Sequence, residues 1–324
     1  MSGVSGFINV YKEKGFTSHD VVAVVKKLLM GAGPGVAKQA GKKFKVGHTG
    51  TLDPAAEGVL PVCVGKATKL ADYAGSGLKR YRAVLKLGIT SDTLDDTGTI
   101  LSRSVVTVTP EEIAAVVRSF QGEIMQLPPM YSALKVRGER LYEIARRGGI
   151  TEREARLVTI ASIDILEFHD DNTLAIEVVC SRGTYIRALC HDIGDKLGCG
   201  GVMGSLVRTA SGVFGIETAL RIGQLREAAE RGAILEHIRP IEECLHFDSV
   251  TVSETGTPSM LNGCKVRFES LLSGGVPVSG GRVFVRSFDG VLGGLHEYVY
   301  EQPASPKGER SLVLKPLVML AGGS

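Results

Sequence analysis

The stretch VGHTGTLDPAAEGVLPVCVGKATKL, from Val46 to Leu70, is the most constrained part of this chain of 324 residues. Three glycines, a histidine and an Asp-Pro pair lie between Val46 and Gly58. A residue before proline is biased away from helix, so Asp53 is expected on a loop. The glycines allow tight turns and the close approach of another molecule. The stretch therefore predicts a stiff loop that presents one carboxylate.

Asp53 has two interpretations at this stage. An ionised carboxylate can act as a nucleophile without a neighbouring base, although in a closed pocket it needs an orienting cation to stay ionised. The alternative is that Asp53 only caps a turn, because Asp-Pro pairs are common in glycine-rich loops.

Charge is distributed unevenly along the chain. The net charge is +3, but residues 1–90 carry fourteen Lys or Arg and five Asp or Glu, a balance of +9. Such asymmetry favours a polyanionic partner for the basic part, and a solvated charged face is the alternative. The length predicts two domains, and a hydrophobic content of 44% is enough for a sizeable core.

The sequence gives no signal for a membrane span or a metal site. No apolar run approaches the roughly 20 residues of a membrane span, and no secretory signal is visible. None of the six cysteines forms a C-x-x-C pair, so reduced and mostly buried thiols are expected. The acidic run SDTLDDTG at 91–98 lacks the glycine and terminal Glu of a calcium loop. We expect a cytoplasmic protein without a metal.

Apolar periodicity and end signals predict alternating strands and helices up to about residue 245. Strands are expected at 6–12, at 79–88 with Tyr81 on its apolar face, and at 157–181 as a pair joined by HDDN. Helices are expected at 17–30, 109–122 and 222–232, in a short segment ending at Gly148, and after Thr184. A glycine-rich basic loop at 31–43 follows the first helix.

The pattern changes after about residue 246. Short β-like runs replace helical periodicity, and glycines separate most of them. This predicts a small β-rich domain of roughly 75 residues, so we divide the chain into 1–245 and 246–324.

Four further segments carry aromatic and basic side chains: KRYR around Tyr81, CSRGTYIRALCHDIG, GSLVRTASGVF and QLPPMYSALKVRGERLYEIAR. Together with GHTGTLDPAAEGVLPVCVGKATKL, they resemble the TruB-type tRNA pseudouridine synthases, the bacterial stand-alone enzymes. The resemblance covers about residues 6–215. The C-terminal segment is compatible, more weakly, with the PUA-like RNA-binding domain that these enzymes often carry.

The resemblance implies a fold and a reaction. The fold is of α/β type, with a mixed, mostly antiparallel central sheet flanked by helices, followed by a small PUA-like β-barrel. The reaction converts one uridine in the T-loop of tRNA, position 55 by tRNA convention, to pseudouridine. The base is flipped out, detached, turned and re-attached through carbon. No cofactor and no protein partner are implied, and we expect a monomer that binds tRNA.

The resemblance also implies roles for single residues. Asp53 corresponds to the catalytic aspartate and Arg187 to the arginine that pairs with it. Tyr81 corresponds to the tyrosine that stacks on the target base and is implicated in proton removal at C5. His48 corresponds to the histidine that fills the space left by the flipped base, and Leu206 to an apolar pocket residue.

Physical considerations agree with these roles. Arg187 can form a bidentate, charge-assisted bond to Asp53. Tyr81, flanked by basic residues, offers a stacking face within a phosphate-binding surface. We therefore add to the substrate-binding residues Gly50, Tyr185, Arg80, Lys38, Lys42, Lys43 and Lys45. The four lysines are expected to contact tRNA phosphates, so neutralising them should flatten the salt dependence of binding.

Other interpretations stay open. Tyr81 could be an ordinary strand aromatic, Arg187 a surface cation, His48 a structural turn residue and Leu206 plain core. The whole chain could be a non-catalytic tRNA-binding or RNA-folding protein, a hydrolase, or a guide-RNA-dependent synthase. Intact Asp53, Tyr81 and Arg187 argue against the first rival. A hydrolase would need a recruited water and a nearby general base, and the sequence signals neither. A guide-RNA-dependent synthase is disfavoured by the GHTGTLDP form and by the absence of long basic tails.

The chain departs from the family pattern at three positions. Glu13 stands in KEKG where a proline is usual, and Val202 and Val207 stand where His and Arg are frequent. These departures concern local RNA contacts and loop rigidity, and they leave the three expected catalytic residues unchanged.

Overall fold

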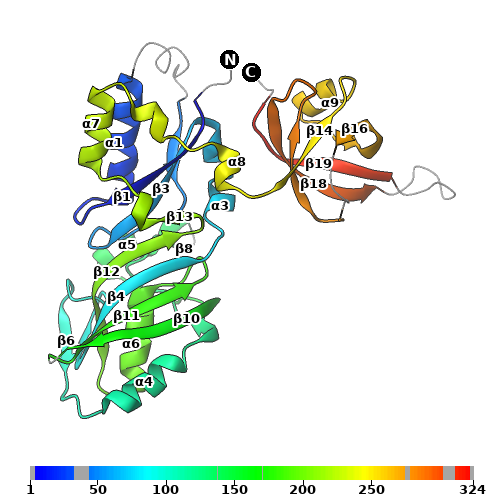
Figure 1. Cartoon of the computed structure of the whole chain (residues 1–324). Helices are drawn as coiled ribbons and strands as arrows, with labels where there is room; N and C mark the ends of the chain where they lie inside the picture. Colours follow the sequence, from blue (N-terminus) through cyan, green and yellow to red (C-terminus); the bar gives the residue numbers. More distant parts are fainter. Residues whose placement is uncertain are drawn as a thin grey trace.

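The computed structural model describes residues 4–32, 44–136, 138–169, 171–273, 278–301 and 311–321. Figure 1 shows a large α/β part, with a smaller β-rich part beside it. The predicted α/β fold with a mostly antiparallel sheet is confirmed. The predicted boundary at 245/246 falls between the last helix of the first part and the first strand of the second, and remains a prediction.

A nine-stranded sheet forms the larger part. All its pairings are antiparallel except β12 with β3. In spatial order its strands are β1 (Gly6–Lys12), β3 (Glu57–Val64), β12 (Gly201–Ser211), β4 (Lys79–Leu87), β11 (Thr173–Cys180), β10 (Arg156–Phe168) and β7 (Gly122–Gln126), with β13 (Phe214–Gly215) beside β12 and β2 (Val46–His48) beside β3.

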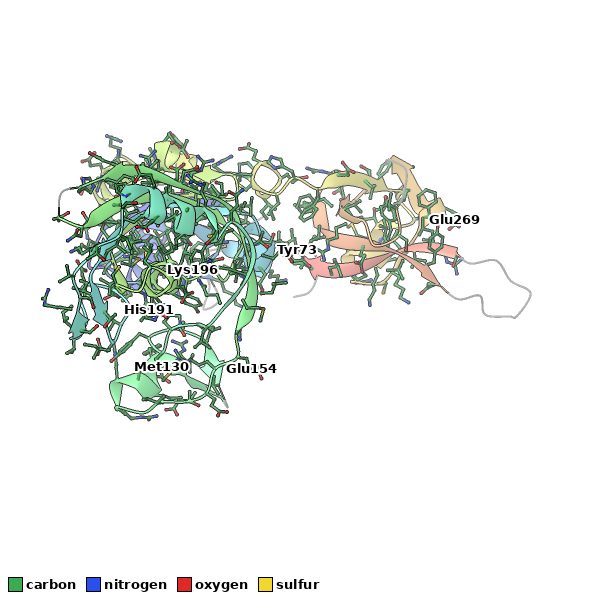
Figure 2. The ribbon with its side chains drawn as sticks, turned by 90° about the horizontal axis from the view of Figure 1, so that it is seen from below. Tyr73, Met130, Glu154, His191, Lys196 and Glu269 are labelled. Atoms are coloured by element: carbon green, nitrogen blue, oxygen red, sulfur yellow. The ribbon has the colours of Figure 1, made fainter. Side chains whose placement is uncertain are left out.

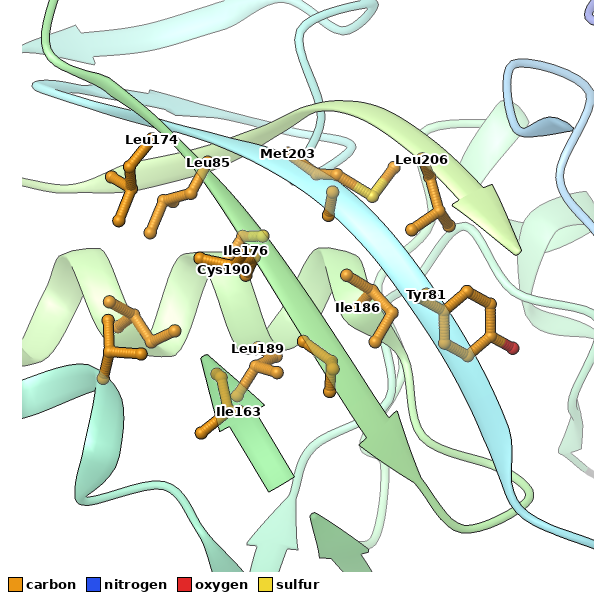
Figure 3. Packing of buried hydrophobic residues seen from close by; sticks show 14 of the residues in the cluster. Tyr81, Leu85, Ile163, Leu174, Ile176, Ile186, Leu189, Cys190, Met203 and Leu206 are labelled. Atoms are coloured by element: carbon orange, nitrogen blue, oxygen red, sulfur yellow. The ribbon is translucent and has the colours of Figure 1, made fainter. Parts of the chain in front are cut away.

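Helices cover the sheet, and two of the hydrophobic clusters among the described residues lie between helices and strands of this part. α6 (Ile186–Lys196) and α4 (Pro110–Arg118) pack near β4, β10 and β11, where alternate β4 residues from Tyr81 to Leu87 are buried as expected (Figure 3). α1 (Ser18–Gly31) and α7 (Ile222–Glu230) pack against each other and share the other core with β1 and β3. Thr17 caps α1 through a reciprocal capping box with Asp20.

The remaining elements of this part are short. They are the 3₁₀ segments η2 (Gly65–Leu70), η3 (Ile216–Thr218) and η4 (Ile234–His237), the helices α3 (Ala71–Ala74), α5 (Leu141–Arg146) and α8 (Ile241–Cys244), and the hairpins β5 (Ile89–Ser91)–β6 (Ile100–Arg103) and β8 (Lys135–Val136)–β9 (Glu139–Arg140).

The second part is a six-stranded, nearly closed, barrel-like sheet. Its strands are β14 (Asp248–Val252), β15 (Val266–Arg267), β16 (Leu271–Ser273), β17 (Arg282–Arg286), β18 (Leu292–Glu301) and β19 (Ser311–Met319), accompanied by α9 (Thr257–Leu261) and η5 (Phe268–Ser270). Phe247 joins the two parts, since its ring contacts Tyr73 at 6.1 Å and Phe284 at 5.4 Å between centroids. An ion pair between Arg286 and Glu242 at 2.5 Å adds to this junction.

Most predicted elements have the expected positions, with one clear difference. The helix predicted at 109–122 begins with Thr109 as cap but ends at Arg118. Gly122 has a φ of 111° and opens β7, so it belongs to the strand and not to the helix cap.

Of the six cysteines, Cys264 is exposed and the other five are buried and free, as expected for reduced thiols. The loop predicted at 31–43 lies outside the described residues from position 33 onward.

Gly58 permits the parallel contact between β3 and β12. It has a φ of +104°, and a Cβ there would lie 2.2 Å from the carbonyl oxygen of Arg208. Gly58→Ala should therefore lower the free energy of unfolding by about 2–4 kcal/mol, through left-handed strain and overpacking. Urea unfolding followed by circular dichroism measures this. Gly223→Ala is the control, because a Cβ at Gly223 meets nothing within 4 Å. Equal stability of both variants would contradict the prediction.

Candidate active site

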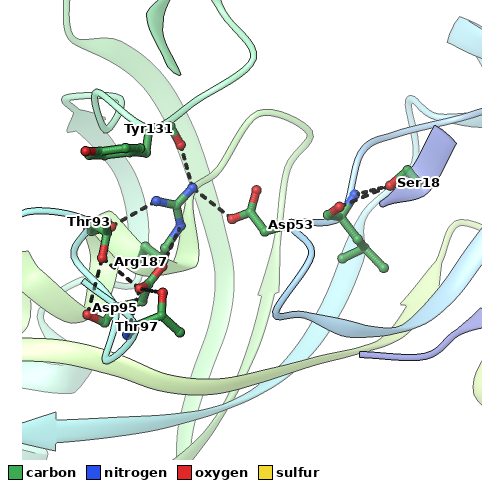
Figure 4. Close-up of polar contacts among 8 residues, drawn as sticks. Ser18, Asp53, Thr93, Asp95, Thr97, Tyr131 and Arg187 are labelled. Carbon is green, nitrogen blue, oxygen red and sulfur yellow. Dashed lines mark hydrogen bonds and ion pairs between the residues drawn. The ribbon is translucent and has the colours of Figure 1, made fainter. Parts of the chain in front are cut away.

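The loop that carries Asp53 is fixed from two sides. Ser18, at the start of α1, donates its hydroxyl to the Leu52 carbonyl at 3.1 Å and accepts from the Leu52 amide at 2.9 Å (Figure 4). The ammonium of Lys12, which is fully buried, lies within hydrogen-bonding distance of four backbone carbonyls, among them Ala56 at 2.6 Å and Pro54 at 3.3 Å. The residues on both sides of Asp53 are therefore held, and its own carboxylate is left partly free.

Arg187 binds that carboxylate from the first turn of α6. Its Nη2 lies 2.8 Å from Asp53 Oδ2, and its side chain is 5% exposed against 43% for Asp53. The prediction of a bidentate bond to Asp53 is wrong, because the guanidinium of Arg187 also donates to backbone carbonyls of two other loops. Nη1 donates to the Thr93 carbonyl at 2.9 Å and Nη2 also to the Tyr131 carbonyl at 2.7 Å. One guanidinium thus connects three loops, and the other oxygen of Asp53 is not engaged by Arg187.

Asp95 supports Arg187 from the acidic run at 91–98. Its Oδ2 lies 3.8 Å from Arg187 Nε. Its Oδ1 accepts from the Thr93 hydroxyl at 2.7 Å, the Thr97 hydroxyl at 2.6 Å and the Thr97 amide at 3.1 Å. The acidic run therefore neutralises and orients a buried arginine. Among the residues described here, no group of three or more His, Cys, Asp or Glu could hold a metal ion.

The change Asp95→Asn should slow the chemical step about 10- to 100-fold. It removes the negative charge facing Arg187 Nε, so the guanidinium is held less firmly against Asp53, and small misplacements of a catalytic group carry costs of this size. Single-turnover product formation with excess protein measures the effect. Asp92→Asn, on the same loop, is the matched control. An unchanged rate in the Asp95 variant would show that Arg187 needs no such support.

A pocket of about 420 Å³ opens beside Asp53. That volume falls in the range typical of small-molecule sites. Every predicted residue of the central site lines it: Asp53, Tyr81, Arg187, His48, Gly50, Tyr185 and Leu206. Leu206 and Tyr81 also belong to the hydrophobic core, so the two interpretations of Leu206 hold together (Figure 3).

Burial shapes the protonation of the pocket. Desolvation raises the pKa of Tyr81 and of Tyr185, so both phenols are neutral at pH 7. Desolvation, together with the nearby Arg208 and His19, lowers the pKa of His48, which favours the neutral ring. Lys79 is buried with its ammonium bound to the carbonyls of Gly75 and Gly77, and burial lowers its pKa to about 8.

Several predicted RNA-binding residues lie outside the pocket. Arg80 is exposed on the face of β4 opposite to Tyr81, and it pairs with Glu177 at 3.3 Å. The role of Arg80 in substrate binding therefore stays a prediction, and it concerns the exposed face of β4 and not the pocket. Lys45 is exposed and does not line the pocket. Lys38, Lys42 and Lys43 lie outside the described residues.

Four residues of this site were not assigned a role from the sequence: Lys12, Ser18, Asp95 and Arg208. Each acts on backbone groups or on another side chain, so a local pattern alone does not reveal its role. A signal existed for Lys12, which begins KEKG, and for Asp95 in the acidic run. The roles of Ser18 and Arg208 are recognised only from the backbone groups that they contact in the folded structure.

Solved structures share this fold. A Cbf5-Nop10-Gar1 complex matches with a TM-score of 0.70 at 27% identity, over 98% of this chain and 85% of that one. An H/ACA RNP bound to a substrate RNA containing 2'-deoxyuridine matches with a TM-score of 0.68 at 25% identity, over 97% and 84%. The fold is that of the pseudouridine synthases.

Sequence comparison narrows the class. The family model described as TruB family pseudouridylate synthase (N terminal domain) matches residues 38–186, and that of the tRNA pseudouridylate synthase B C-terminal domain matches 187–246. The tRNA pseudouridine synthase B of Alkaliphilus oremlandii is 46% identical over 81% of this chain and 83% of its own length. That of Clostridium kluyveri is 45% identical over 83% and 88%. The chain belongs to the TruB family of pseudouridylate synthases.

Proposed function

We propose that this protein converts uridine 55 in the T-loop of tRNA to pseudouridine, with Asp53 as nucleophile. The observation that carries the proposal is the carboxylate of Asp53, which a buried Arg187 binds at the edge of a pocket that also contains Tyr81. The relatives named as tRNA pseudouridine synthase B support tRNA as the substrate. We infer a cytoplasmic enzyme. No described helix has the length and apolar content to cross a membrane.

The reaction fits the residues of the pocket. It breaks the bond between N1 of uracil and C1′ of ribose, and it forms a bond between C5 and C1′. The proton on C5 leaves to water, and N1 gains a proton. The Asp53 carboxylate is partly exposed and paired with Arg187, so it can attack either the ribose or the base and be released at the end. No cofactor enters the proposal.

The substrate base must leave the RNA stack to reach Asp53. A flipped base needs an apolar or aromatic pocket, which Tyr81, Tyr185 and Leu206 provide.

Arg182 at the rim of the pocket is about half exposed and pairs with Asp72 at 2.8 Å. The segment with Met130 and Glu154 stands away from the body of the sheet domain (Figure 2). We propose that tRNA lies against this rim, with no protein partner required and with one chain per tRNA.

Tritium release tests the proposal. An unmodified tRNA transcript labelled with [5-³H]uridine is incubated with the full chain, and tritium in water is counted. The matched control is the same transcript with cytidine at position 55. We expect about one tritium per tRNA from the first transcript and none from the second. Equal release from both transcripts would refute the position. No release despite tight tRNA binding would favour a non-catalytic RNA-binding protein.

A further inference from the structure

Arg208 is a buried cation that binds backbone carbonyls. It lies on β12, is 1% exposed, and is the largest of the fully buried side chains. Its Nε donates to the Val59 carbonyl at 2.7 Å, and its Nη2 donates to the Gly50 carbonyl at 3.2 Å. Among the described ranges of the chain, no Asp or Glu forms an ion pair with it. Burying a charge in this way is costly, so a compensating function is expected.

Tyr81 is the cross-strand neighbour of Arg208. The two residues are directly opposite each other in the β4–β12 register. Side chains at such positions lie on the same face of the sheet, about 5 Å apart at Cβ. Both line the pocket beside Asp53. The guanidinium therefore lies next to the phenol ring that is expected to contact the substrate base.

Other charged and titratable groups also face Tyr81. Cys180 approaches from β11, Asp53 from its loop, Lys79 from the same face of β4 and His48 from β2. Burial raises the pKa of the Tyr81 phenol, Arg208 is the largest opposing influence, and Cys180 and Asp53 act in the same direction as burial. The ammonium of Lys79 is occupied by two backbone carbonyls. Arg208 is thus the group that most favours a phenolate at this position.

We propose that Arg208 is a positioning residue, which holds Tyr81 and stabilises its phenolate for proton removal from C5 of the base. This inference rests on the proposed function. In the step, the phenolate oxygen takes the C5 proton, and the electron pair of the C5–H bond returns to the ring. The phenol then passes its proton to water. Since Arg208 is 1% exposed and lies opposite Tyr81, its proposed action is on Tyr81.

The same guanidinium also reaches the loop of the nucleophile. Gly50, whose carbonyl it binds, lies three residues before Asp53 and lines the pocket. The bond to Val59 ties this arrangement to β3, where Gly58 lets the backbone of Arg208 come close. One buried cation therefore fixes the phenol that removes the C5 proton and the loop of the Asp53 carboxylate relative to each other.

The test compares Arg208→Gln, which removes the charge, with Arg208→Lys, which keeps it. The matched control is Arg82→Gln, one residue beyond Tyr81 on the opposite face of β4. The first measurement is the pH profile of single-turnover tritium release at saturating protein. The second is the phenolate absorbance of Tyr81, obtained by subtracting the titration of Tyr81→Phe, and it needs no activity. Thermal unfolding establishes that each variant is folded.

We expect the rising limb of the pH profile to move to higher pH in Arg208→Gln, with at least about a tenfold lower rate at neutral pH. The Tyr81 phenolate should appear at higher pH as well. Arg208→Lys and Arg82→Gln should keep the limb where the native protein has it. A folded Gln variant with an unmoved limb would overturn the inference. If Arg208→Gln does not fold, the test depends on Arg208→Lys. A rising limb displaced in Arg208→Lys would overturn the inference, and a rising limb at the native position would support it.

The two proposals fail in distinguishable ways. If the native protein releases no tritium, the proposed function is wrong, while the Tyr81 titration still reports whether Arg208 stabilises the phenolate. If the native protein is active and the titration is the same with and without Arg208, only the role of Arg208 is wrong.

Discussion

Asp53→Asn should abolish tritium release, with a fall of about 10⁴-fold or more, the size seen when a nucleophile or its equivalent is removed. The amide has the shape of the carboxylate but not its negative charge, so it cannot attack carbon. Its position is retained, because Ser18 and Lys12 hold the neighbouring backbone. The measurement is single-turnover release from [5-³H]uridine-labelled tRNA.

The control for this prediction separates chemistry from folding and binding. Asp53 is 43% exposed, so its substitution should leave the thermal midpoint nearly unchanged and tRNA affinity within a few-fold. Asp164→Asn makes the same chemical change at an exposed position of β10. A variant at position 53 that released tritium at the native rate would remove Asp53 from the mechanism and leave it as a turn residue.

Lys12→Met should lower the free energy of unfolding by about 3–5 kcal/mol. Methionine fits the apolar stem but leaves four backbone carbonyls without the ammonium that they bind, and hydrogen bonds from a charged group are worth about 1.5–3 kcal/mol each. Part of this loss is offset, because the native ammonium is desolvated, which lowers its pKa to about 8. Urea unfolding at pH 7 measures the difference.

Lys14→Met is the control, since Lys14 is exposed two residues further along the same turn. It should change stability by less than about 0.5 kcal/mol. Loss of the Lys12 ammonium should also loosen the loop of Asp53, because two of the four carbonyls belong to Pro54 and Ala56. A fully stable Lys12 variant would show that water replaces the ammonium. The departure at Glu13 does not disturb this arrangement, as Lys12 binds only the backbone carbonyl of Glu13.

Elements with strong local signals were predicted well from the sequence. The strand at 6–12, the capped helix from Ser18 and the alternating strand around Tyr81 all have the expected positions. Their periods and caps are properties of neighbouring residues, so one sequence is enough to recognise them. The same alternation places Arg80 and Arg82 on the face of β4 opposite to Tyr81.

The strands β3 and β12 were not predicted. β3 contains Pro61, which argues against an interior strand. In the sheet, the Pro61 carbonyl accepts from the Thr49 amide, and the Pro61 nitrogen faces the same side of β3. On that side of β3, the pairing with β12 ends at Gly58 and the pairing with β2 begins at Val62. The missing donor therefore interrupts no ladder. β12 contains Gly201 and Gly204, and glycine weakens the signal of a strand because it has no side chain to pack.

The sequence by itself determined the fold class, the loop of Asp53 and the identity of the residues in the pocket, because these depend on short-range patterns and on long motifs. The tertiary structure decided how the charges are arranged: one oxygen of Asp53 on Arg187, Asp95 behind Arg187, and Lys12 and Arg208 buried against backbone carbonyls. A buried charge is stable only where partners from distant segments converge on it, and that convergence exists only once the sheet has formed.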